Sequence, residues 1–152
     1  FSGKTEFTED TVHDECNTSH VTAGLKECKE QEQNQHLRYE TKYSANTGGG
    51  SNTASYVTST TDYLFELAEF EYHGARTYAN SAEKNYQAQY DYYRAGNSKV
   101  HYRHNATGTA AGAWGRSVNS RNGNGFCLVN TDGGAGHANA YSAWALAPCF
   151  FV

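Results

Sequence analysis

The chain contains no isoleucine and no methionine, a single proline, and only a few leucine and valine residues. Such a shortage of aliphatic side chains is typical of chains that cannot bury a core and remain disordered. Aromatic side chains supply the missing apolar area here, because 12 Tyr, 7 Phe and 2 Trp are spread along the 152 residues. Each aromatic side chain buries a large area, so a core needs fewer of them. We therefore predict one folded domain with an aromatic core.

Clustered positive charge is also absent. The formal net charge is -4, and Lys and Arg are scattered along the chain without a run. Nucleic acid and anionic membrane surfaces both attract clustered Lys and Arg, so neither is expected as a partner. No apolar stretch approaches the roughly 20 residues of a membrane span, so no membrane insertion is expected. The opening FSGKTEFTED lacks the plan of a signal peptide, and the missing initiator Met favours a fragment or a processed form.

The signatures of catalysis and of cofactor binding are missing as well. No G-x-S-x-G turn presents a nucleophile, and the TGGGS loop lacks the Lys that would complete a phosphate cradle. NTDGG lacks the alternating acidic series and the distal Glu of a calcium loop. His101 and His104 would point to opposite faces of a strand. We therefore expect no enzyme, no cofactor and no metal site.

Four cysteines are present: Cys16, Cys28, Cys127 and Cys149. They allow three disulfide pairings, of which 16–28 with 127–149 is the simplest. The alternative is four buried thiols that act as small apolar residues, and the sequence leaves both interpretations open. Neither pair has the close C-x-x-C spacing of a structural zinc site.

The first third of the chain has the pattern of helices. Thr8 and Thr22 can each cap one, and acidic residues occupy the first turn after Thr8. A loop over 47–55 follows, rich in Gly and Ser. Leu64–Leu67 is then predicted as a core strand, with Ala68–Tyr72 as a turn or a short continuation.

The clearest predicted helix runs from Asn80 to Ala95. Asn80 and Glu83 form a capping box, and Ala95-Gly96 supplies the stop. Short strands are then expected in KVHYRH and at three places near the end, separated by Gly- and Asn-rich turns. The predicted fold class is α+β with short antiparallel strands and long polar loops. The three late strands are Phe126–Val129, Trp144–Leu146 and Cys149–Phe151.

Between Val118 and Tyr141 the side chains are mostly Asn, Ser, Gly and Ala. Antibody paratopes favour a similar mixture, in which rings give rigid contact area and small polar groups give adaptable hydrogen bonds. Ordinary surface loops contain the same residues, so composition alone does not distinguish the two.

The order of several motifs resembles the C-terminal domains of phage tail and bacterial surface proteins. Those domains carry W-L-R-S-P, then F-x-x-V-x-x-x-G, then G-V-R-P-A-F, and this chain has WGRS, FCLVNTDGG and SAWALAPCFFV. The upstream segments TTDYLFELAEFEYHG and YQAQYDYYRAGNSKVHY are also similar, so the resemblance covers Thr41 to Val152. The chain departs from the pattern at four positions: Gly115, Val118, Ala145 and Ala147.

The resemblance implies a C-type-lectin-like fold of the formylglycine-generating-enzyme type, akin to the variable proteins of diversity-generating retroelements. It assigns residues 41–152 to a ligand-binding domain, and we expect residues 1–40 to form a helical segment packed on it. In such proteins a fixed framework presents a variable face on C-terminal strands and loops. The expected framework residues are Trp114, Arg116, Phe126, Val129, Trp144, Leu146, Pro148 and Phe150.

The residues expected on the ligand-binding face are mostly polar, and Tyr141 and Arg121 are its expected anchors because hot spots favour aromatic rings and Arg. The full set is Asn119, Arg121, Asn122, Asn124, Leu128, Asn130, Thr131, His137, Asn139 and Tyr141.

These features predict a non-enzymatic receptor-binding domain, at a phage tail fibre tip or in a tail protein, that recognises a bacterial surface protein or glycan. The expected location is the virion tail or the cell surface. A homotrimer or a larger fibre would strengthen weak single sites by avidity. The alternatives are a bacterial adhesin with a lectin-like domain, and a virion decoration module without a ligand.

Overall fold

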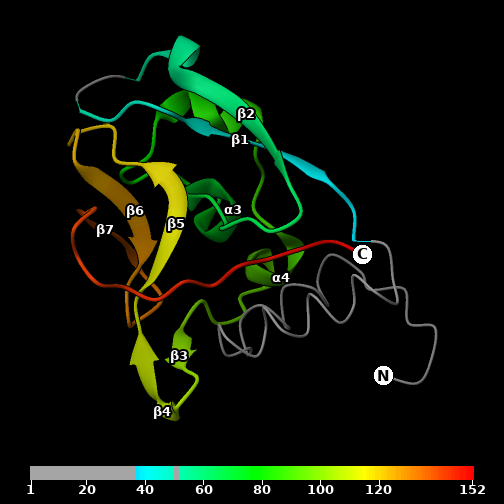
Figure 1. Ribbon diagram of the computed structural model, residues 1–152, viewed down its shortest axis with the longest axis vertical. Helices are drawn as coiled ribbons and strands as arrows, with labels where there is room; N and C mark the ends of the chain where they lie inside the picture. The colour runs from blue at the N-terminus through cyan, green and yellow to red at the C-terminus, as the bar shows by residue number, and fades with distance from the viewer. Residues whose placement is uncertain (1–36, 50–51) are drawn as a thin grey trace.

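A computed structural model describes residues 37–49 and 52–152 (Figure 1). The two helices expected near Thr8 and Thr22, together with Cys16 and Cys28, lie outside these residues. The described part is mixed α+β: seven short antiparallel strands lie in three small sheets, together with two short α-helices. The predicted α+β class is confirmed at this level.

The first sheet is a two-stranded ribbon of β1 (Glu40–Ala45) and β2 (Val57–Asp62). Thr, Val and Tyr favour extended backbone, and the strands pair in register from Glu40 opposite Asp62 to Ala45 opposite Val57. The short 3-10 helix η1 (Ala54–Tyr56) leads into β2. Most of β2 is exposed, so this ribbon contacts the core mainly through β1.

The next segment differs from the prediction. Leu64–Leu67 is not a strand, and Phe65 forms only an isolated bridge to Cys149. The predicted turn that follows is instead the helix α3 (Glu69–His73). Its start is closed by Glu71, whose Oε2 accepts the backbone N–H of Ala68 at 2.8 Å, and its end by Gly74 in the left-handed region at φ 68°.

The single helix predicted from Asn80 to Ala95 is also wrong, because the segment divides into η2 (Ser81–Asn85) and α4 (Asp91–Arg94). The cap itself is present, since Asn80 Oδ1 accepts the N–H of Ala82 at 2.9 Å. Glu83, however, does not complete a capping box. Its carboxylate accepts from the N–H of Ala45 and from Ser117, and these tertiary partners outcompete the local pattern.

The remaining strands form two sheets. β3 (His101–Arg103), which lies in the predicted KVHYRH strand, pairs with β4 (Ala106–Ala111). The larger sheet has the order β5-β6-β7. The predicted strand Phe126–Val129 is confirmed within β6. The bounds of these three strands are Ala113–Val118 for β5, Gly125–Val129 for β6 and Ala135–Asn139 for β7.

The last residues cross the molecule from the β5-β6-β7 sheet to the start of β1 (Figure 1). Two strands were predicted here, but the segment contributes isolated bridges to three separate parts of the chain: Ala145 with Ala113, Cys149 with Phe65, and Phe151 with Arg38. The C-terminal segment therefore links three parts of the chain that lie far apart in the sequence.

The core confirms the aromatic prediction, and it contains few aliphatic side chains. Some of the expected framework residues lie elsewhere: Phe126, Trp144 and Leu146 are exposed by 37%, 39% and 51%. Cys127 and Cys149 are buried thiols that are not bridged to each other, so the 127–149 pairing is wrong. The main core cluster consists of Phe65, Leu67, Tyr72, Tyr90, Tyr93, Val129 and Cys149.

Candidate ligand-binding face

Lys42, Glu71 and Arg116 form a buried charge network. It lies on the side of the β5-β6-β7 sheet that faces the core, which we call the inner side. The guanidinium of Arg116 donates to the Glu71 carboxylate and, at 2.9 Å, to the backbone carbonyl of Glu66. The Lys42 ammonium lies 3.6 Å from Glu71 and 4.4 Å from the centre of the Phe65 ring. All three charged side chains are at most 11% exposed, so each charge is paired inside the protein rather than solvated, and the buried Nε of Arg116 has no hydrogen-bond partner among the described residues.

Two further buried carboxylates bind backbone groups. Glu69 accepts the N–H groups of Thr77, Tyr78 and Ala79, which fixes the loop after α3. Glu83 accepts from Ser117 Oγ at 2.6 Å, and burial raises the pKa of its carboxyl group. These side chains have their hydrogen bonds within the fold, so we assign them a structural role.

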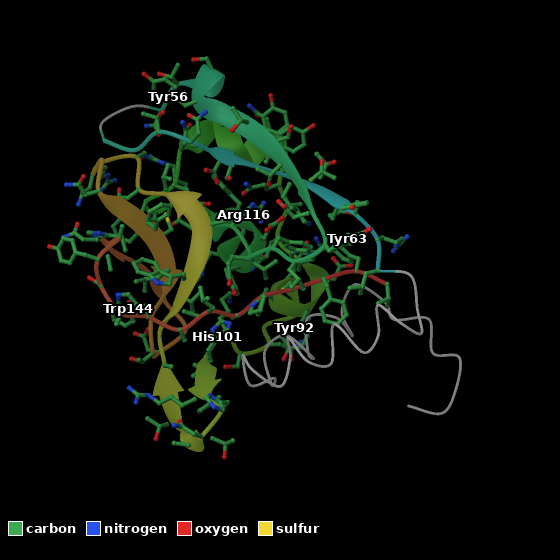
Figure 2. The ribbon with its side chains drawn as sticks, viewed as in Figure 1. Tyr56, Tyr63, Tyr92, His101, Arg116 and Trp144 are labelled. Carbon is green, nitrogen blue, oxygen red and sulfur yellow. The ribbon has the colours of Figure 1, made fainter. Side chains whose placement is uncertain are left out.

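An irregularity in β5 determines which of its side chains point to the inner side of the sheet and which point to the outer side. Trp114 pairs with Leu128 and Val118 with Phe126, so β5 holds extra residues opposite β6 at this point. Such a bulge re-aims side chains. Arg116 lies within it and points inward to Glu71, whereas Trp114 stays on the outer side with Leu128. In Figure 2, Arg116 lies near the centre of the molecule and Trp144 lies apart from it, in the C-terminal segment.

Strand alternation identifies the residues on the outer side. Phe126 and Leu128 share one side of β6, and their partners on β7 are the small residues Ala138 and Gly136. The parallel bridge between Ala113 and Ala145 places Trp144 and Leu146 on the same side as Trp114. The side chains that form this aromatic face are Trp114, Phe126, Trp144 and Leu146.

The aromatic face contains a shallow depression of about 240 Å³. It is lined by Trp114, Gly115, Phe126 and Ala140, with no charged side chain among them. The two rings meet edge to face with their centroids 6.2 Å apart. Gly136 and Ala138 in β7, and Ala140 after the strand, are small residues, so they leave the depression open.

Three Asn side chains and one Tyr side chain lie together beyond the paired ends of β6 and β7, and we call Asn122, Asn124, Asn139 and Tyr141 the asparagine edge. Asn139 is opposite Gly125 in the register, so its side chain lies on the side of the sheet opposite Phe126. Asn122 Nδ2 donates to Asn139 Oδ1 at 3.0 Å, and Asn139 Nδ2 donates to the Tyr141 hydroxyl at 2.7 Å. Ala140 N donates to the carbonyl of Asn124 at 2.9 Å. The fold therefore brings together four residues that sequence analysis had placed on one face.

Other predicted face residues lie elsewhere. Asn119 and Leu128 are only 1% and 4% exposed, so the expectation that they lie on an exposed face is wrong. Asn119 is buried because its Oδ1 and its backbone hold the turn before β6. Leu128 shares the outer side of β6 with Phe126, and its side chain packs over Gly136 of β7. Asn130 and Thr131 follow β6 at the end opposite the asparagine edge.

Two more predicted residues are exposed but separate from the depression. His137 pairs with Cys127 across the sheet, on the side opposite Phe126, and its ring lies 4.6 Å from the ring of Tyr78. Arg121 is exposed in the turn before β6. Neither residue lines the depression.

Sequence analysis missed the aromatic face itself. Trp114, Phe126, Trp144 and Leu146 were assigned to the framework because large apolar residues usually lie inside. One signal was available: small residues recur at every second position from Gly136 to Ala140, which leaves the side chains opposite them uncovered.

Several buried groups titrate abnormally. Burial raises the pKa of Glu66 to about 7, although the N–H of Ala147 opposes the shift. Burial also lowers the pKa of His73, with help from Lys99, and that of His101, in each case to about 4. The pKa of the Cys127 thiol is raised by burial, so this thiol is not a nucleophile at neutral pH.

Within residues 37–49 and 52–152, no group of three or more His, Cys, Asp or Glu side chains is placed to hold a metal ion. In the same residues, none of the helices has the length and apolar character needed to span a membrane.

Comparison with known proteins gives a family and no named relative. No curated protein and no solved structure matches the chain. Residues 21–152, which are most of the chain, match the family DUF6273, described as a domain of unknown function. The chain belongs to this family.

Proposed function

We propose that this chain is a non-enzymatic ligand-binding domain that recognises a molecule on a bacterial surface through its aromatic face and asparagine edge. The single observation that carries the proposal is the exposure of Phe126, Trp144 and Leu146 on the aromatic face, where Phe126 also lines the depression. Contiguous exposed apolar surface rimmed by polar groups marks binding sites. An exposed apolar face lowers the solubility of a protein, and a ligand that covers the face would explain why it is present.

The motif resemblance supplies the biological setting. We propose a C-type-lectin-like fold in a phage tail fibre tip or tail protein, in which the buried charge network fixes the framework and the outer residues are free to vary. Tyr141, which is 85% exposed, and Asn124 can change without leaving a cavity or an unpaired buried group.

The test is binding of the fluorescently labelled domain to a panel of bacterial cells, measured by flow cytometry. Leu146→Asp places a charge on the aromatic face at a side chain that is 51% exposed, so binding should fall at least about tenfold while folding is unchanged. The matched control is Thr60→Asp on exposed β2. Equal binding by both variants, or no binding of the wild-type domain to any strain, would reject the proposal.

A further inference from the structure

We infer that Asn122 is a modification site: its side-chain amide reacts with the backbone nitrogen of Gly123, loses ammonia and is hydrolysed to a carboxylate. Two Asn-Gly pairs follow one another before and at the start of β6, namely Asn122-Gly123 and Asn124-Gly125. The fold places the two pairs in different surroundings, and these surroundings select the first pair. Water is the only other reactant, so the modification is independent of the proposed function.

The reaction begins with the backbone nitrogen of the residue that follows an asparagine. This nitrogen gives up its proton to base and attacks Cγ of the side-chain amide, which closes a cyclic imide. The bond from Cγ to Nδ2 breaks, and Nδ2 takes up a proton and leaves as ammonia. Water then opens the imide at either carbonyl, which gives Asp or an isoaspartyl linkage. Glycine favours the attack because it has no Cβ to obstruct it.

The first support is the state of the two backbone nitrogens. The N–H of Gly125 donates to the carbonyl of Asn122 at 3.2 Å, and Gly125 is buried as the first residue of β6. The N–H of Gly123 has no hydrogen-bond partner among the described residues, and Gly123 is exposed. An exposed, unbonded N–H loses its proton to base more readily than one that is buried and bonded. Gly123 N is therefore the nitrogen that is free to attack.

The second support is the position of the Asn122 amide. Its Oδ1 accepts the backbone N–H of Asn124 at 2.9 Å, which folds the side chain back along its own backbone. As Gly123 N attacks Cγ, negative charge develops on Oδ1, and the same N–H stabilises this charge as an oxyanion donor does in an enzyme. The turn also removes part of the entropy cost of closing the ring, because it holds the reacting groups together.

The product changes the asparagine edge. Asn122 Nδ2 donates to Asn139 Oδ1 at 3.0 Å, and a carboxylate at residue 122 would set an acceptor against an acceptor. Deamidation therefore breaks this contact between the turn and the end of β7, and it adds a negative charge to a group of neutral side chains. The isoaspartyl product also inserts Cβ into the backbone, which alters the turn that the bond from Gly125 N to Asn122 O closes.

The experiment incubates the folded protein at pH 8 in water enriched in oxygen-18, which labels each carboxylate formed from an imide. Peptide mapping by mass spectrometry then gives the rate at each asparagine. Asn122 should be labelled at least about tenfold faster than Asn124 in the folded protein, because the free nitrogen and the oxyanion donor exist only in the folded turn. In urea, where the turn is lost, the two rates should be similar.

Gly123→Ala is the blocking variant, and it should slow the labelling of Asn122 at least about tenfold, since a methyl group obstructs the attack. Gly108→Ala is the matched control and should leave the rate unchanged, because a Cβ at either glycine meets open space in the fold. Four results would overturn the inference: no label at Asn122, equal rates at Asn122 and Asn124 in the folded protein, a preference for Asn122 that is as large in urea, or an unchanged rate in Gly123→Ala.

Discussion

The two sides of the β5-β6-β7 sheet differ in how their polar groups are satisfied. On the inner side, the buried charge network of Lys42, Glu71 and Arg116 has its partners within the protein. On the outer side, the aromatic face carries no charge, and much of its surface meets solvent. The asparagine edge beyond the ends of β6 and β7 is also neutral. Charges that are buried and paired define one arrangement of the chain, because any other arrangement leaves one of them alone. Neutral groups at the surface impose no such demand.

This difference suggests a division of labour. The inner side specifies the fold, so substitution there should cost stability, whether or not a ligand is present. If the outer side contacts a ligand, as we propose, substitution there should cost binding and leave stability nearly unchanged. The three predictions below test the division, beginning with the largest expected effect.

The largest loss of stability is expected for Arg116→Ala. The substitution removes the guanidinium that binds the Glu71 carboxylate and the carbonyls of Glu66 and Tyr43, and it leaves Glu71 paired only with Lys42. Breaking a buried pair costs about 3–5 kcal/mol, so the free energy of unfolding should fall by that amount in urea denaturation.

Arg121→Ala is the control, since Arg121 is exposed in a turn and its loss should change the free energy by less than about 0.5 kcal/mol. Equal effects of the two arginine variants would show that the buried charge network does not specify the fold.

The sequence predicted features that depend on short-range pattern. The α+β class, the Asn80 cap and the β6 strand all follow from local residue preferences and are present. The single helix from Asn80 to Ala95 fails for a long-range reason. Glu83 is bound by Ala45 and Ser117, which are 38 and 34 residues away in sequence, and no local rule contains those partners.

The candidate site was predictable to a similar degree. Asn122, Asn124, Asn139 and Tyr141 meet because they flank the ends of β6 and β7 that pair with each other, and turn residues in the sequence indicate where these ends lie. The side on which Phe126 lies was not predictable. It depends on strand register and on the bulge in β5, and a shift of one residue would have turned the ring inward.

A smaller effect, which depends on pH, is expected for Glu66→Gln. Glu66 links the two sides: its carboxylate accepts the N–H of Ala147 in the C-terminal segment, which carries Trp144 and Leu146. Burial raises its pKa in the folded state from 4.5 to about 7, so the folded protein binds a proton that the unfolded chain has lost. Its contribution to stability is therefore fully present below about pH 4.5 and is lost as the pH rises to about 7.

Gln keeps an oxygen acceptor for Ala147 and has no charge to bury. Glu66→Gln should thus match the wild-type stability at pH 4.5 and exceed it at pH 8, by on the order of 1–2 kcal/mol in urea denaturation. His73 and His101 titrate with the opposite sign between about pH 4 and 6.5, but they are present in both proteins and cancel from the difference. A difference that stays constant from pH 4.5 to pH 8 would refute the assignment to Glu66.

The smallest effect on stability and a large effect on binding are expected for Tyr141→Ala. The ring is 85% exposed, and its hydrogen bond from Asn139 also lies at the surface. The free energy of unfolding should change by less than about 0.5 kcal/mol. Because exposed rings at a binding face act as anchors, binding to bacterial cells should fall at least about tenfold, or 1.4 kcal/mol. Tyr102→Ala removes the same ring from β3, where it is 51% exposed and belongs to a different sheet from β7, and this variant should bind as the wild type does. If Tyr141→Ala unfolds the domain, the neutral surface residues also specify the fold, and the proposed division of labour is wrong.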